Sequence, residues 1–304
     1  MPKKRKSKLR RRLPLAGIFL LLMIGITVFM YPIVGMWYTE YTSKVIINEY
    51  NQTIQQMGDD AIKTLEKQAT DYNDALAKNK SSDISAVDYN KLLRVAQALG
   101  YIEIPRIDVY YPIFHGMSDE VLQRGIGHLE GTSLPVGGKS THCVLAGHTG
   151  LSSSKLFTDI DQLKTGDSFY IHVLDKVLKY EVDQIKTVLP HQNNDIAIVE
   201  GRDYVTLVTC TPYGINSHRL LVRGKRVPYE TKTMETEKEW PIINNDIVTI
   251  PARTIIWYSS TGLIGFVILG MIIILIFPSF RHKKKAKEPK ENNNAGSDDN
   301  NTEP

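Results

Sequence analysis

Two long apolar runs, one near each end, constrain this chain more than any other feature. Residues 13–38 and 255–280 are almost entirely apolar. Each run exceeds the ~20 residues that a helix needs to cross a hydrocarbon core of ~30 Å. Basic clusters lie on the terminal side of both runs, at residues 3–12 and 281–285. Since cytoplasmic flanks carry this excess of lysine and arginine, the sequence predicts a two-pass membrane protein with both termini in the cytoplasm and its middle outside.

A cleaved signal peptide is the alternative for the first run. We favour a retained anchor, because the run is longer than a usual signal region and lacks a small-residue cleavage site. Trp37, Tyr38, Trp257 and Tyr258 lie at the outer edges of the two runs, where interfacial aromatic residues are found. The formal net charge of +4 comes largely from the clusters beside the membrane, so it indicates no nucleic-acid surface.

The region between the anchors changes character near residue 100. Apolar residues at helical spacing predict a helix over 42–76 and a shorter one over 87–99, so that residues 39–99 form a helical region. Short strands bounded by glycine and proline then follow, at 101–104, 109–114, 142–146, 168–173, 177–188, 204–209 and 218–223. This spacing favours a mainly-β protein with a closed or nearly closed barrel. Residues 227–254 are expected to form a tether, and residues 281–304 a basic and then disordered tail.

The candidate chemistry lies on the last two predicted strands. One strand ends at Cys210, a turn follows, and the next strand begins near Arg219, so a hairpin would bring these two residues together. His148 lies in the earlier segment Ala-Gly-His-Thr-Gly at residues 146–150. A thiolate attacks carbonyl groups, an imidazole supports that state, and a guanidinium can stabilise a negative oxygen. The set is suited to covalent acyl transfer.

Composition and pattern alone leave other interpretations open. Cys210 shares a strand face with Val208 and Thr206, so it could be a packed core residue. Six further histidines compete with His148: His115, His128, His142, His172, His191 and His218. A zinc site from His142, Cys143 and His148 matches no strong metal motif. A disulfide would consume the nucleophile, so we expect Cys143 to be buried and inert.

Several motifs together resemble one enzyme family. Thr-Leu-Val-Thr-Cys at residues 206–210, followed by an arginine strand, is similar to the signature of sortases, the membrane-anchored cysteine transpeptidases of Gram-positive bacteria. Residues 147–150 resemble the histidine motif of that family. The likeness extends over residues 100–226 and includes the segments 100–105, 127–135 and 211–219. The second anchor and the helical N-terminal region resemble the class C branch, which assembles pili.

The resemblance implies an eight-stranded sortase-type β-barrel at residues 100–226, with N-terminal helices and two flanking transmembrane helices. By motif position it assigns the nucleophile to Cys210, the general acid/base to His148, and substrate orientation and oxyanion stabilisation to Arg219. Thr209 and Thr206 are expected to bind the substrate. The resemblance implies no metal and no organic cofactor.

The implied reaction cuts an LPXTG-like sorting signal after its threonine, through a thioacyl intermediate on Cys210. A lysine of another pilin subunit then forms an isopeptide bond. Two alternatives remain: a sortase that attaches surface proteins or pili to cell-wall peptide, and a non-catalytic membrane-tethered binding module. Class C sortases often carry an Asp-Pro-aromatic lid. At the corresponding residues 78–85, Asp83 is followed by neither proline nor an aromatic residue, so we expect a short or absent plug.

Overall fold

The computed structural model describes residues 7–79, 87–151, 154–192 and 194–229. It divides into two units, one of Met1–Phe29 with Asn245–Pro304, and one of Met30–Asn244. The predicted second anchor, most of the tether and the C-terminal tail lie outside the described residues. Most of the lid segment, at residues 80–86, also lies outside them.

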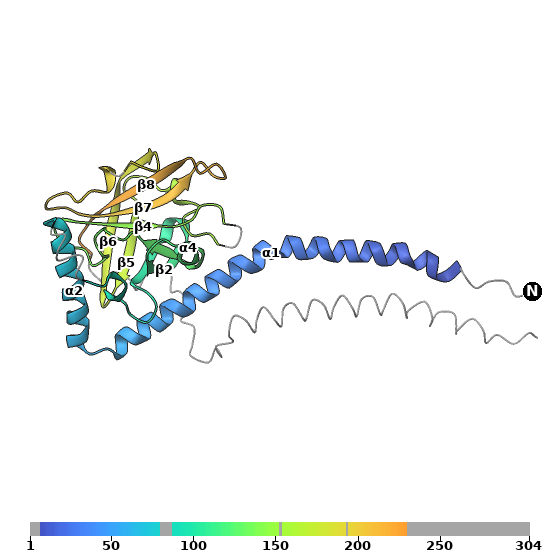
Figure 1. Ribbon diagram of the computed structural model, residues 1–304, viewed down its shortest axis with the longest axis horizontal. Helices are drawn as coiled ribbons and strands as arrows, with labels where there is room; N and C mark the ends of the chain where they lie inside the picture. The colour runs from blue at the N-terminus through green and yellow to red at the C-terminus, as the bar shows by residue number, and fades with distance from the viewer. Residues whose placement is uncertain (1–6, 80–86, 152–153, 193, 230–304) are drawn as a thin grey trace, which may run out of the picture. The chain divides into compact units, whose positions relative to one another are not determined.

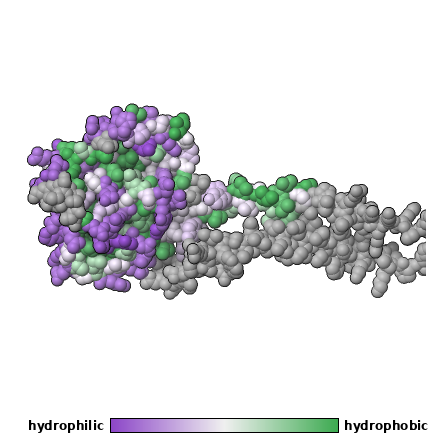
Figure 2. All heavy atoms as spheres, viewed as in Figure 1, coloured by the Kyte–Doolittle hydropathy of each residue, from purple (hydrophilic) through white to green (hydrophobic). Residues whose placement is uncertain are grey.

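Helix α1 (Ser7–Gln56) contains the first predicted anchor. Among the described residues, only its stretch Gly17–Gln56 is long and apolar enough to cross a membrane. Large apolar side chains on it are exposed, for example Leu21 at 70% and Phe29 at 71%. Figure 2 shows hydrophobic residues gathered on this helix, while the barrel presents mostly hydrophilic residues on the same face of the view. An apolar surface of this extent fits a helix that lies in lipid.

The helical region differs from the sequence prediction at two places. The helix expected over 42–76 is interrupted at Gly58, which has an extended backbone, and α2 (Asp59–Ala77) begins after it. Asp59 and Asp60 in the first turn of α2 favour a new helix start there, because carboxylates stabilise the positive end of a helix dipole.

The prediction of a helix over residues 87–99 is wrong. The segment contains only the single turn η1 (Tyr89–Lys91), and Leu93 and Ala96 have left-handed φ values of 53° and 50°. The reason is burial: Leu92, Leu93, Val95, Ala98 and Leu99 are all at most 4% exposed. Neighbours such as Leu92 and Leu93 would point to different sides of a helix, whereas an irregular chain directs all five into the core.

Eight strands form a closed barrel, as predicted (Figure 1). They are β1 (Gly100–Ile104), β2 (Val109–His115), β3 (Ile126–His128), β4 (Thr141–Ala146), β5 (Ser168–Val173), β6 (Lys176–Val188), β7 (Asp203–Thr211) and β8 (His218–Arg226). Their order is β1-β2-β3-β4-β7-β8-β6-β5, and β5 pairs with β1 to close the barrel. The β2–β3 and β4–β7 pairs are parallel.

The sequence pattern did not predict strand β3, but it did predict the short helix α4 (Asp119–Arg124). Strand β3 has only three residues, too few to show a period of two. In the sequence, Asp119 and Glu120 favour the first turn of a brief helix over residues 118–125. Helix α4 confirms this prediction, and it connects β2 to its parallel neighbour β3. A parallel pair needs such a crossover connection.

Side-chain alternation on β7 decides which residues face outward. Val205 and Leu207 are fully buried in the barrel interior, and Leu207 lies opposite Leu145 of β4 and Val222 of β8. Because successive side chains point to opposite faces, Thr206, Val208 and Cys210 lie on the outer face. A slip of one residue would turn the buried side chains outward, so the hydrophobic core fixes the direction of Cys210.

Buried polar contacts attach the N-terminal helices to the barrel. The Asn73 side chain of α2 donates to the Leu134 carbonyl at 3.1 Å and accepts from the Leu134 amide at 2.7 Å. The Tyr50 hydroxyl of α1 accepts from the Leu174 amide at 2.7 Å and donates to the Leu99 carbonyl at 3.3 Å. Buried polar groups are costly unless they are paired, so these contacts fix where the helices dock.

Candidate active site

The hairpin of β7 and β8 places Cys210 and Arg219 directly opposite each other. The two residues are Cα partners in the antiparallel register, one pair before the hairpin loop begins. Side chains of directly opposed residues extend from the same face of a sheet. Both side chains are half-buried, so they remain within reach of a ligand on the outer face.

The parallel neighbour β4 brings His148 to the same level. Its register with β7 runs to the pair Ala146–Val208, and the Gly147 amide donates to the Val208 carbonyl at 3.1 Å. Continued by two residues, this register sets His148 beside Cys210. His148 is half-buried. The ends of three adjacent strands thus gather the three residues that the sequence singled out.

Two threonines connect the segment that holds His148 to the strand that holds Cys210. The Thr209 hydroxyl donates to the Gly147 carbonyl at 2.7 Å, and it lies 2.6 Å from the Thr149 hydroxyl. A hydroxyl has a single hydrogen, so Thr149 donates in the second contact. We call these two hydrogen bonds the threonine bridge. It ties both neighbours of His148 to the residue that precedes Cys210.

The threonines expected to bind substrate have buried hydroxyls that are already bonded. Thr209 is 5% exposed and takes part in the threonine bridge. Thr206 is 1% exposed, and its hydroxyl lies 2.7 Å from Nε2 of His142. A substrate-binding role for either residue stays a prediction.

Most of the competing histidines are engaged elsewhere. His115, His128 and His142 bond to the carbonyls of Leu92, Ser133 and Ala197, and His172 pairs with Glu103 at 3.0 Å. Burial lowers the pKa of His128 to about 4 and also lowers the pKa values of His115 and His142. His218 contacts Ser217 and precedes Arg219 in the strand, so it faces the other side of the sheet. His191 lies exposed between β6 and β7.

The two cysteines are both free, and their surroundings differ. Cys143 is 3% exposed and lies inside the barrel opposite Val205. Burial, with a smaller effect from Asp203, raises the pKa of its thiol well above the usual value, which makes it a poor nucleophile. His142 precedes it on β4 and faces outward, so His142 and Cys143 cannot bind one metal ion together.

Arg219 is held by the loop that joins β7 to β8. Its Nη1 donates to the Asn216 carbonyl at 3.1 Å and to the His218 carbonyl at 3.0 Å. The loop itself turns tightly, since the Ile215 and Asn216 amides both donate to the Pro212 carbonyl. A guanidinium has five N–H donors, so contacts from Nη1 alone leave Nε and Nη2 for a substrate oxygen.

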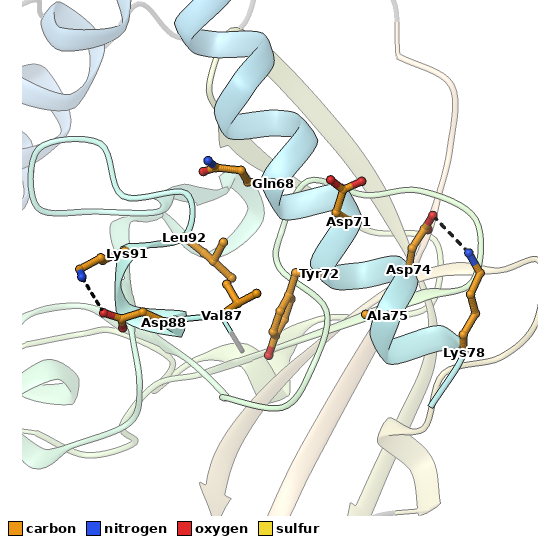
Figure 3. A pocket seen from close by; sticks show the side chains of 10 residues that line it. All are labelled: Gln68, Asp71, Tyr72, Asp74, Ala75, Lys78, Val87, Asp88, Lys91 and Leu92. Atoms are coloured by element: carbon orange, nitrogen blue, oxygen red, sulfur yellow. Dashed lines mark ion pairs between the residues drawn. The ribbon is translucent and has the colours of Figure 1, made fainter. Parts of the chain in front are cut away.

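A cavity of about 670 Å³ lies in the helical region rather than on the strands that carry Cys210. Figure 3 shows it between α2 and the segment 87–92, with Tyr72 and Leu92 facing each other across it. Ion pairs Lys78–Asp74 at 3.7 Å and Lys91–Asp88 at 3.1 Å border it. Lys78 and Val87 line it, and residues 80–86 lie outside the described residues, so the expectation of a short or absent plug stays untested.

Comparison with known proteins identifies the family. A family model for the sortase domain matches residues 102–227. The crystal structure of sortase C1 from Streptococcus agalactiae is 47% identical, with a TM-score of 0.58 over 61% of this chain and 99% of that one. The chain belongs to the sortase family. It is therefore a cysteine transpeptidase, and the barrel described above is the sortase fold.

Two further relatives place this sortase within its family. A sortase C crystal structure from Streptococcus pneumoniae is 46% identical, with a TM-score of 0.55 over 60% of this chain and 97% of that one. Sortase A of Bacillus anthracis is 29% identical over 196 residues, which are 64% of this chain and 88% of the relative. The solved neighbours are thus class C sortases, and the class A relative is more distant in sequence.

Proposed function

We propose that this sortase joins pilin subunits, with Cys210 as nucleophile, His148 as general acid/base and Arg219 as the group that orients the substrate. The register of β4, β7 and β8 carries the proposal, because it gathers a thiol, an imidazole and a guanidinium on one outer face. The crystal structure of the Streptococcus pneumoniae sortase C is described as giving insight into pilin substrate specificity. This similarity supports pilin as the substrate class here.

In the first half-reaction, the Cys210 thiolate attacks the threonine carbonyl of an LPXTG-like sorting signal. The carbonyl oxygen becomes an oxyanion, and the free N–H groups of Arg219 lie on the same face of the hairpin to stabilise it. His148 donates a proton to the departing amine as the peptide bond breaks. A thioester remains on Cys210, and the C-terminal part of the signal leaves.

In the second half-reaction, the side-chain amine of a pilin lysine attacks the thioester carbonyl. His148 accepts the proton of that amine, and the thiolate of Cys210 departs. The new bond is an isopeptide between two subunits, and the enzyme returns to its starting state. The groups required are thiol, imidazole and guanidinium, so the proposal needs no metal or cofactor.

We further propose a two-pass topology with both termini in the cytoplasm and the barrel on the extracytoplasmic face. Sortases are membrane-associated, and α1 supplies one apolar helix of sufficient length. The basic clusters at residues 3–12 and 281–285 support the orientation. This arrangement places Cys210 where exported subunits pass.

Incubation of the full-length enzyme with two pilin subunits tests the function. We expect covalent ladders from the wild type and none from Cys210→Ala. Ladders that persist in Cys210→Ala would reject the mechanism. Attachment to a cell-wall amine without ladders would favour the alternative of cell-wall attachment.

A further inference from the structure

The loop between β7 and β8 exposes two large apolar side chains. Ile215 is 72% exposed and Tyr213 is 68% exposed. Among the described residues outside α1, these are the most exposed large hydrophobic side chains, since the next is Val199 at 44%. Both lie between Cys210 and Arg219 in the sequence. Tyr213 therefore places an exposed aromatic ring close in sequence to the reactive pair.

Tyr213 contacts the segment that carries His148. A Cβ atom placed on Gly150 would lie 2.9 Å from Cε2 and 3.1 Å from Cζ of the Tyr213 ring. The ring therefore packs close to Gly150, and a side chain on residue 150 would require the ring to shift. Gly150 also has a left-handed φ of +80°, which favours glycine on its own account. The three atoms nearest to that Cβ position all belong to Tyr213.

Several contacts hold the segment 147–150, which we call the histidine loop. The Gly147 amide donates to the Val208 carbonyl at 3.1 Å, and the His148 carbonyl accepts from the Phe157 amide at 3.2 Å. The threonine bridge holds Gly147 and Thr149, and the Gly150 amide donates to the Thr158 hydroxyl at 3.2 Å. Tyr213 supplies a further contact, and it comes from the loop that also binds the Arg219 guanidinium through Asn216. The same loop therefore touches the histidine loop at one position and holds the arginine at another.

We infer that Tyr213 is a positioning residue, whose ring packs on Gly150 and so fixes the histidine loop relative to Cys210 and Arg219. The inference rests on the proposed function, because it assumes that His148 and Cys210 react together. Displacement of a catalytic group by about 1 Å can cost about 100-fold in rate. A ring that holds the loop in register affects the turnover rate more than substrate affinity.

The test measures kcat and KM of the full-length enzyme in detergent with an LPXTG-type peptide and a lysine-containing acceptor peptide. We expect Tyr213→Ala to lower kcat at least about tenfold with KM little changed. Tyr213→Phe keeps the ring and should retain the wild-type kcat. Ile215→Ala is the matched control, since it removes an equally exposed apolar side chain from the same loop, and it should leave kcat unchanged.

A second pair of variants tests the contact from the other side. Gly150→Ala inserts a methyl group against the ring and should lower kcat. Gly131→Ala is its control, because Gly131 has a similar φ of +84° and open space where the added methyl group would lie. In a Tyr213→Ala background the methyl meets no ring, so Gly150→Ala should cause a smaller further loss than in the wild type.

Several results would overturn the inference. A raised KM with unchanged kcat in Tyr213→Ala would make the residue a substrate contact, and an equal loss in Ile215→Ala would make the loop a docking surface. Failure of Tyr213→Phe to retain activity would assign the effect to the hydroxyl. Wild-type kcat in both Tyr213→Ala and Gly150→Ala would remove the role altogether. Activity that survives Cys210→Ala would instead reject the proposed function, so the two failures can be told apart.

Discussion

Thr209→Val gives a sharp test of the threonine bridge. Valine has nearly the shape of threonine, so the substitution keeps the packing at a site that is 5% exposed. It removes the hydroxyl that donates to Gly147 at 2.7 Å and accepts from Thr149 at 2.6 Å. The buried Gly147 carbonyl left without a hydrogen bond costs about 1–3 kcal/mol, whereas the half-buried Thr149 can turn to the Phe157 carbonyl, so we expect a loss of up to about 3 kcal/mol.

Urea unfolding and thermal melting measure the loss of stability. For a folded region of this size, about 3 kcal/mol corresponds to a fall in Tm of about 6–12 °C. Transpeptidation should fall more than tenfold at a temperature where the variant is still folded, because both neighbours of His148 lose their attachment. Thr209→Ser restores the hydroxyl and should recover most of the rate. A Thr209→Val enzyme with wild-type Tm and rate would refute the role that we give to the bridge.

Three further predictions concern packing, pH and thiol reactivity. Gly147→Ala would set a methyl group 2.8 Å from the Phe157 ring and 2.9 Å from Cδ1 of Ile126, so we expect a loss of about 1–3 kcal/mol in urea unfolding, and a neutral result would show that the site has spare room. His128 has a pKa near 6.5 in the unfolded chain and about 4 in the folded protein, so the unfolded state binds more protons between these pH values. The free energy of unfolding should therefore fall as pH drops through that window, by up to about 3 kcal/mol. His115 and His142 act in the same direction, and a His128→Gln variant whose stability depends on pH as steeply as the wild type would contradict the assignment. Iodoacetamide should label Cys210 and spare Cys143 until the protein unfolds, as mass spectrometry of the two cysteine peptides can check, and early labelling of Cys143 would contradict its burial.

The barrel could be predicted from the sequence because its strands alternate clearly. Val205 and Leu207 point inward and Cys210 outward on β7, and this period of two is visible in the residue types. Strand β3 has no such signature, because three residues carry no measurable period. The β5–β1 pair that closes the barrel has no local signature either, since pairing between distant strands is set by tertiary packing.

The helical region shows where local reasoning fails. The apolar spacing around Ile47 and Tyr50 continues across Gly58, so the break between α1 and α2 depends on one glycine followed by two aspartates. Residues 87–99 look helical by composition, yet they form an irregular cover because the barrel buries Leu92, Leu93 and Leu99 together. Burial against a surface formed elsewhere in the chain overrides helix propensity.

The site residues could be predicted from their motifs, but the contacts that hold them in place could not. Cys210, His148 and Arg219 are identifiable by type and by position next to strand ends. The attachment of Thr209 to Gly147 and Thr149 depends on the parallel pairing of β4 and β7, which no local pattern encodes. The contact of Tyr213 with Gly150 joins two loops that are far apart in the sequence. A glycine two residues after the histidine and an aromatic residue three after the cysteine are its only signals in the sequence.

Mass spectrometry of the full-length enzyme, acid-quenched during turnover of an LPXTG-type peptide, tests the central claim most directly. We expect an acyl adduct on the peptide that contains Cys210, ending in the threonine of the sorting signal. Hydroxylamine should remove this adduct, as it removes a thioester. The adduct should be absent from Cys210→Ala. An adduct on another residue, or undiminished product formation by Cys210→Ala, would contradict this claim.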